Sequence, residues 1–161
     1  MTADTQKVFL ITPRLGGLAN DLMIQTEEKK TLYHVRTRLF SPLGQQYLIY
    51  DDKEQLILTT REDHTVMFPT HTVFEKDNQV AKLGQQGVIP QNYFIEIDHK
   101  PRLIMRIPIF SGIFNLEGHH GIMAEIAQHR TTWIVAIKTE PDYLLCLMLI
   151  AVIYKEYSIG G

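Results

Sequence analysis

An apolar run at residues 143–154 constrains this 161-residue chain more than any other feature. Thr139 and Asp142 fit a helix capping box and Pro141 suits a first-turn position, so we expect a helix over about residues 140–157. A helix that is apolar on every side must be enclosed by protein or by lipid. The run falls within the roughly 10–14 residues of buried core helices, short of the ~20 that a bilayer span needs. We therefore predict that the rest of the chain encloses one buried helix.

The residues before this helix have the pattern of an all-β fold. Across residues 31–138, short runs rich in Val, Ile, Tyr, Phe and Leu recur about every 8–12 residues between clusters of Asp, Asn, Gly and Pro. This pattern predicts about ten to twelve strands, one of them a short candidate at residues 66–68. An open sheet would cover one side of the helix, whereas a closed barrel covers every side and leaves no strand edge exposed. We predict a mainly β fold, a closed antiparallel barrel with the apolar helix in its lumen.

One domain is expected, because a chain of this length can bury most of its apolar surface in one core. Residues 1–30 carry only two small apolar groups, at 8–11 and 22–24, on either side of a glycine pair. We interpret this segment as a partly ordered N-terminal arm. The barrel domain is predicted to span residues 31–161.

The charge and the cysteine content of the chain indicate which partners and which cellular compartment to expect. With 16 Lys plus Arg against 18 Asp plus Glu, the chain is nearly neutral, so nothing in its overall charge attracts nucleic acid. Cys146 is the only cysteine and lies inside the apolar run, so we expect no internal disulfide. The apolar cluster at residues 8–11 is too short for a secretion signal. These features predict a cytoplasmic protein, peripheral at the membrane if it binds one, with no transmembrane span.

The sequence contains no pattern typical of catalysis or cofactor binding. None of its three serines lies in a nucleophile-elbow context, and its seven histidines do not have the spacing of metal ligands. Asp51 and Asp52 lack the later ligands of a calcium loop and are better explained as a turn. No glycine-rich phosphate loop occurs. We therefore expect no enzymatic activity, no metal and no cofactor.

Two rows of basic residues are the candidate binding site. Strand alternation places Arg36 with Arg38 on one face of a strand, and Lys100, Arg102 and Arg106 on one face of another. Fixed cations on an outer sheet face can hold a phosphorylated lipid headgroup, which arginine contacts in a bidentate manner. The same residues would also suit a solvated strand face that prevents aggregation. The sequence does not decide whether the two rows adjoin.

Several motifs follow one another in a distinctive order: YHVRTRLFS at 33–41, YLIYD at 47–51, the repeated strand-turn-strand units, and WIVAI at 133–137 before the acidic cap and apolar helix. This order, over about residues 31–157, resembles the LURP-one-related family of the tubby C-terminal-like superfamily, which also contains the phospholipid scramblases. The resemblance implies a barrel of about twelve strands around a central hydrophobic helix, and a membrane-tethering, lipid-binding or scrambling role. The chain departs from the scramblases in lacking a Pro-rich arm, a palmitoylated cysteine cluster and a long apolar tail.

Three classes of function remain open from the sequence. The first is a non-enzymatic module that binds a lipid headgroup or membrane surface, with an anionic phospholipid or phosphoinositide as its partner. The second is a protein-interaction scaffold that uses residues 1–30 or an outer face of the barrel. The third is an enzyme or a scramblase, and the filled lumen disfavours an enzyme because the usual cavity of a barrel is occupied.

Overall fold

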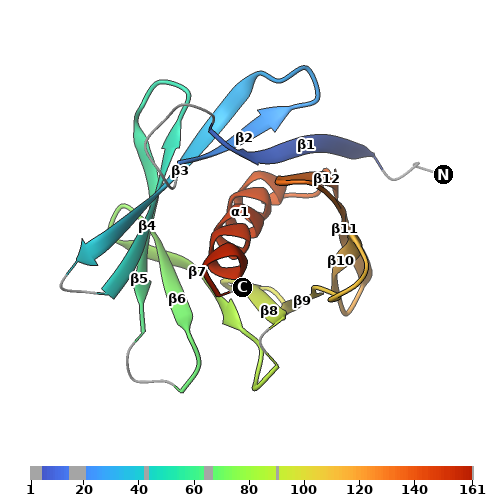
Figure 1. Cartoon of the computed structure of the whole chain (residues 1–161). Helices are drawn as coiled ribbons and strands as arrows, with labels where there is room; N and C mark the ends of the chain where they lie inside the picture. The colour runs from blue at the N-terminus through green and yellow to red at the C-terminus, as the bar shows by residue number, and fades with distance from the viewer. Residues whose placement is uncertain (1–4, 15–20, 42–43, 64–66, 90, 161) are drawn as a thin grey trace.

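A computed structural model describes residues 5–14, 21–41, 44–63, 67–89 and 91–160. The elements in chain order are β1 (Gln6–Pro13), β2 (Leu22–Thr26), β3 (Thr31–Ser41), β4 (Gly44–Asp51), β5 (Leu56–Glu62), β6 (Thr70–Glu75), β7 (Asn78–Gln85), β8 (Asn92–Ile97), β9 (Leu103–Arg106), β10 (Ile113–Gly118), β11 (Gly121–His129), β12 (Thr132–Lys138) and α1 (Tyr143–Gly160). The twelve described strands pair antiparallel in sequence order, and β1 pairs with β12 to close a barrel. Figure 1 shows α1 inside the ring of strands. The predicted fold class is confirmed.

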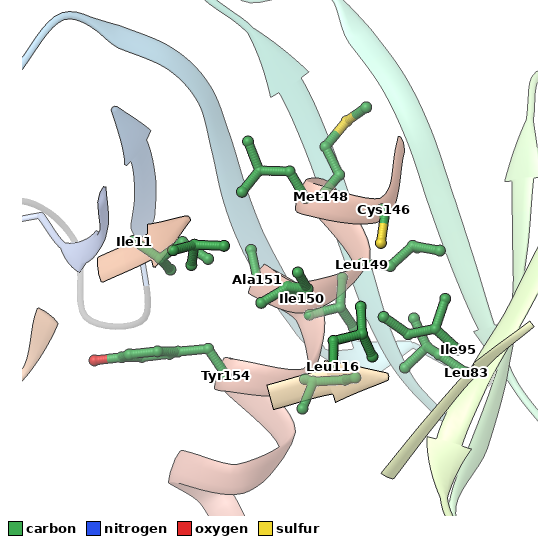
Figure 2. Close-up of a cluster of buried hydrophobic side chains, with 14 of the residues drawn as sticks. Ile11, Leu83, Ile95, Leu116, Cys146, Met148, Leu149, Ile150, Ala151 and Tyr154 are labelled. Atoms are coloured by element: carbon green, nitrogen blue, oxygen red, sulfur yellow. The ribbon is translucent and has the colours of Figure 1, made fainter. Parts of the chain in front are cut away.

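The core lies between the helix and the inner face of the barrel. Strand alternation supplies that face: in β12, Trp133, Val135 and Ile137 are buried, while Ile134 between them is exposed. The close-up in Figure 2 labels residues from four strands and from α1 that meet in this core: Ile11, Leu83, Ile95, Leu116, Leu149, Ile150 and Ala151. Residues 146–155 of α1 are all buried, so the barrel encloses the helix on every side.

The start of the helix differs from the predicted capping box. The Thr139 hydroxyl donates to the carbonyl of Thr5 at 3.1 Å, and the Asp142 carboxylate lies 2.7 Å from Nζ of Lys100. Neither side chain is therefore used as a reciprocal cap. The first helical hydrogen bond runs from the Cys146 amide to the Asp142 carbonyl at 3.0 Å, and the helix spans Tyr143–Gly160 instead of about residues 140–157.

The N-terminal segment does not form the expected arm but contributes two strands to the barrel wall. In β1 and β2, Phe9, Ile11, Leu22 and Ile24 point inward and are at most 5% exposed. The two small apolar groups seen in the sequence contain the inward-facing positions of these strands. Without β1 and β2, β3 and β12 would present open edges. The barrel therefore begins at Gln6 and not at residue 31.

The described part of the candidate strand at residues 66–68 is not a strand. Val66 lies outside the described residues, and Met67 and Phe68 form a bend before β6 begins at Thr70. Pro69 precedes that strand, and its carbonyl accepts a hydrogen bond from the Gln85 amide at 3.0 Å.

The connections between strands alternate between the two ends of the barrel, because neighbouring strands are antiparallel. Lys100, in the β8–β9 connection, contacts Asp142 just before α1, and the Tyr154 hydroxyl, near the other end of α1, contacts the Thr131 carbonyl in the β11–β12 connection. We call the end where α1 begins, with the connections after even-numbered strands, the N-rim. We call the end where α1 finishes, with the connections after odd-numbered strands, the C-rim.

A buried polar cluster joins the last turns of α1 to the wall near the C-rim. Glu156 accepts a hydrogen bond from the Tyr47 hydroxyl at 3.0 Å, and its other carboxylate oxygen contacts Nε2 of His71. The rings of Tyr47 and His71 meet edge to face at 5.3 Å, and both side chains are almost fully buried. Burial and the neighbouring Glu156 raise the pKa of Tyr47 above its ordinary value. Because an apolar helix could otherwise slide along its lumen, this cluster fixes its register.

Replacing Leu147 with Asp should abolish folding. Leu147 is 0% exposed, and a carboxylate there would be enclosed by apolar side chains at a cost of several kcal/mol. Ser158→Asp, at an exposed position of the same helix, is the matched control and should fold. A Leu147→Asp protein that melts cooperatively by circular dichroism would contradict this prediction.

Replacing Glu156 with Ala should lower the free energy of unfolding. The Tyr47 hydroxyl and the His71 ring would lose their acceptor inside the barrel, at about 1–3 kcal/mol for each buried group left unpaired. Glu140→Ala makes the same chemical change at an exposed position before α1 and should have little effect. Urea unfolding compares the two variants, and equal midpoints would show that the cluster does not stabilise the fold.

Stability should fall as the pH rises above the ordinary pKa of tyrosine. Burial, followed by Glu156 and Tyr157, raises the pKa of Tyr93 from 10.0 to about 12. The folded protein therefore holds this proton more tightly than the unfolded chain, so its contribution to stability is complete below pH 10.0 and is lost between 10.0 and about 12. Urea unfolding across this window should show the decline, and Tyr93→Phe should flatten it. An unchanged slope in that variant would exclude Tyr93 as its source.

Candidate functional site

The two basic rows predicted from the sequence lie on opposite walls of the barrel. Arg36 and Arg38 are on β3, whereas Arg102 and Arg106 belong to the start and end of the β9 region, with Lys100 in the preceding connection. Strands β3 and β9 are six strands apart in either direction around the closed wall. The rows therefore do not adjoin, and together they do not form one headgroup site.

Most cations of the two rows already have partners. Three of them contact carboxylates, at these nitrogen–oxygen distances: Arg36 with Glu54 at 3.1 Å, Lys100 with Asp142 at 2.7 Å, and Arg102 with Glu96 at 3.0 Å. The guanidinium of Arg102 also lies 4.1 Å from the centre of the Phe94 ring. A phosphate would have to compete with these carboxylates, so the three residues are poor candidates for an anion site.

Arg38 and Arg106 differ from the other three and lie at the C-rim. Both are exposed, and neither contacts a carboxylate of the described residues. Arg38 makes a long hydrogen bond of 3.5 Å to the Gln46 side chain. Three further exposed arginines, absent from the sequence prediction, lie at the same rim: Arg14 after β1, Arg61 near the end of β5, and Arg130 in the β11–β12 connection.

Carboxylates at the C-rim are less exposed than its arginines: Asp21 is buried, and Glu62 and Asp63 are half-buried. Asp21 is 8% exposed and lies 3.3 Å from Arg14, and Glu62 accepts a hydrogen bond from the Gln45 amide at 2.9 Å. In the connections and adjoining strand ends that the structure describes at this rim, no Asp or Glu is fully exposed. The exposed charge of the C-rim is therefore carried by arginine.

The N-rim has the opposite character. Its connections and adjoining strand ends mix lysines with many exposed carboxylates: Glu27, Glu28, Asp52, Glu54, Glu75, Asp77, Glu140 and Asp142. A nearly neutral molecule is thus polarised along the barrel axis, with exposed basic charge at one end. Such a distribution can orient a molecule in an external field even where net charge gives no attraction.

A small cavity lies at the N-rim beside the start of α1. Its volume is about 160 Å³, below the roughly 300–1,000 Å³ of typical small-molecule sites. Its lining includes His119, His120, Lys100 and Cys146. Burial raises the pKa of the Cys146 thiol to about 12, with Lys100 opposing the shift, so this thiol is a poor nucleophile at neutral pH. The cavity offers no evident catalytic arrangement.

In the described parts of the chain, no group of three or more His, Cys, Asp or Glu side chains could hold a metal ion. Within the same parts, no helix has the length and apolar character needed to cross a membrane.

The similarity of this chain to known proteins lies in its fold and not in its sequence. No protein-family model matches the sequence, and no curated protein matches it. Among solved structures, the barrel is similar to the X-ray structure of a protein from Arabidopsis thaliana, AT5G01750, with a TM-score of 0.66 and 13% sequence identity. The similarity covers 93% of this chain and 90% of that one. At this identity, the chain is shown to share the barrel fold of the Arabidopsis protein.

Proposed function

We propose that this chain is a non-enzymatic module that binds anionic membrane surfaces through its C-rim. The observation that carries the proposal is the set of exposed arginines there, of which Arg38, Arg61, Arg106 and Arg130 contact no carboxylate in the described residues. Guanidinium groups pair with phosphate in a bidentate manner and are weakly hydrated, which suits contact with phospholipid headgroups. The LURP-one-related resemblance supports this class of protein, and the similarity to the Arabidopsis structure supports its barrel fold.

The arrangement favours attraction to many headgroups over recognition of one. The arginines are spread around the rim, on β3, β5, β9 and the β11–β12 connection, and do not converge on one wall. We therefore place selective phosphoinositide binding second to a general affinity for anionic phospholipid. The cytoplasmic leaflet, where anionic lipids concentrate, is the proposed location.

The size of the electrostatic attraction sets the strength of binding. Each basic residue near an anionic membrane contributes about 1 kcal/mol, so four arginines give about 4 kcal/mol. This free energy corresponds to a dissociation constant of about 1 mM, a weak and reversible attachment. The exposed carboxylates of the N-rim would be repelled by the same surface, which orients the C-rim towards the membrane.

Co-sedimentation with vesicles tests the proposal. The protein should sediment with vesicles that contain phosphatidylserine at low ionic strength, less so as salt rises, and not with pure phosphatidylcholine. The triple variant Arg38→Gln, Arg106→Gln and Arg130→Gln should bind more weakly, by about fivefold for each lost cation, with an unchanged melting temperature.

A charge-matched variant at the N-rim is the control. Lys29→Gln, Lys53→Gln and Lys76→Gln remove the same net charge from exposed positions of the opposite end and should leave sedimentation unchanged. Equal losses in the two triple variants would show that net charge, not the C-rim, controls binding. Failure of the unaltered protein to bind anionic vesicles would overturn the proposed function and favour a protein-interaction scaffold.

A further inference from the structure

The C-rim also carries the most exposed apolar side chains in the described residues. They lie in three connections and at the first residue of β10: Met67 (88% exposed), Val88 (77%), Ile89 (52%), Ile109 (71%), Phe110 (99%) and Ile113 (69%). The other exposed large apolar residues among those described are Leu56 at the N-rim end of β5, which at 52% is as exposed as Ile89, and Ile122 and Ile134, which are 37% exposed.

These apolar residues are neighbours around the barrel. The β5–β6, β7–β8 and β9–β10 connections follow one another along a continuous arc of the wall, because β5 to β10 pair in sequence order. In Figure 1 this arc runs from the green strands β5 and β6 through β7 and β8 to β9 and β10. Arg61 lies at one edge of the arc, and Arg106 lies between its second and third loops. Arg61 lies over the ring of Phe74, 5.4 Å from its centre, and neither Arg61 nor Arg106 contacts a carboxylate of the described residues. The arc therefore combines apolar side chains at loop tips with cations that have no carboxylate partner.

On the basis of the proposed function, we propose that these three loop tips insert into the interfacial region of an anionic phospholipid bilayer. The barrel then docks end-on, with the C-terminal end of α1 towards the membrane and the N-rim away from it. Phe110, Ile109, Val88 and Met67 enter the boundary between headgroups and acyl chains, while Arg61 and Arg106 remain at the level of the phosphates.

The shape and charge of the arc favour a bilayer over a protein partner. Exposures of 71–99% mean that the side chains of Met67, Val88, Ile109 and Phe110, which come from three different connections, project into solvent. Projecting side chains suit a fluid surface that closes around each of them, whereas a protein interface has a packed apolar centre. The flanking arginines complement the negative charge of the membrane. Insertion also supplies affinity that arginine contacts alone do not provide.

Serine substitutions at the loop tips test insertion. Phe110→Ser and Val88→Ser should each weaken binding to vesicles of phosphatidylcholine with phosphatidylserine by about tenfold or more, because burial of one large apolar side chain corresponds to at least that factor. Leu56→Ser, at an exposed apolar site of the N-rim, is the matched control and should bind as the unaltered protein does. All three positions are exposed, so their melting temperatures should stay close to that of the unaltered protein.

A direct probe reports insertion itself. Phe110→Trp adds a surface indole to a chain whose only other tryptophan, Trp133, is 1% exposed. Its emission should shift to the blue with anionic vesicles and be quenched by brominated acyl chains, while Leu56→Trp should show neither change.

If the unaltered protein binds but Phe110→Ser and Leu56→Ser bind equally well, insertion is wrong and electrostatic membrane binding stands. If Phe110→Ser instead changes only the oligomeric state, the arc is a contact between copies of this chain. Absence of any vesicle binding would overturn both proposals.

Discussion

Contact between an apolar helix and the inward-facing side chains of a closed wall is the interaction on which this structure depends. Residues 146–155 of α1 are buried on all sides, so neither the helix nor the barrel interior could exist in water without the other. Closure by β1 and β12 is part of the same constraint, because an open wall would expose one side of the helix. Because the helix fills the interior of the barrel, binding sites are expected at the rims and on the outer faces.

The buried polar cluster complements this apolar core. Dispersion and burial hold α1 in the lumen but distinguish poorly between neighbouring registers of an apolar cylinder. Glu156, bonded to Tyr47 and His71, has partners in only one of them. On the same turn, burial lowers the pKa of Lys155, and the charge of Asp21 opposes that shift. Glu156 thus supplies the polar contacts by which this end of the helix is held to the wall.

The architecture could be predicted from the sequence because its signals are local. The apolar run of α1 and the alternation within each strand are visible in short windows, and together they require a closed wall. Strands β1 and β2 were not predicted because each holds one short apolar group beside a glycine-containing segment, and their pairing partners, β12 and β3, are separate parts of the pattern. The capping box failed because Thr5 and Lys100, distant in sequence, bind Thr139 and Asp142. Arg38 and Arg106 were predicted as members of two separate rows, and Arg14, Arg61 and Arg130 were missed, because only the alternation of strand direction brings these arginines to one end.

The pairing of β1 with β12 has a consequence for how the chain is made. On the ribosome, β1 emerges long before its partner β12, and the helix that fills the lumen follows all twelve described strands. Until β12 emerges, β1 presents an unpaired edge, and until α1 emerges the inward-facing side chains of the strands lack the helix that covers them. Folding should therefore finish only after α1 has left the ribosome, with late, long-range closure as the slow step. We therefore expect chaperones that shield incomplete β-sheets to bind such a chain during synthesis.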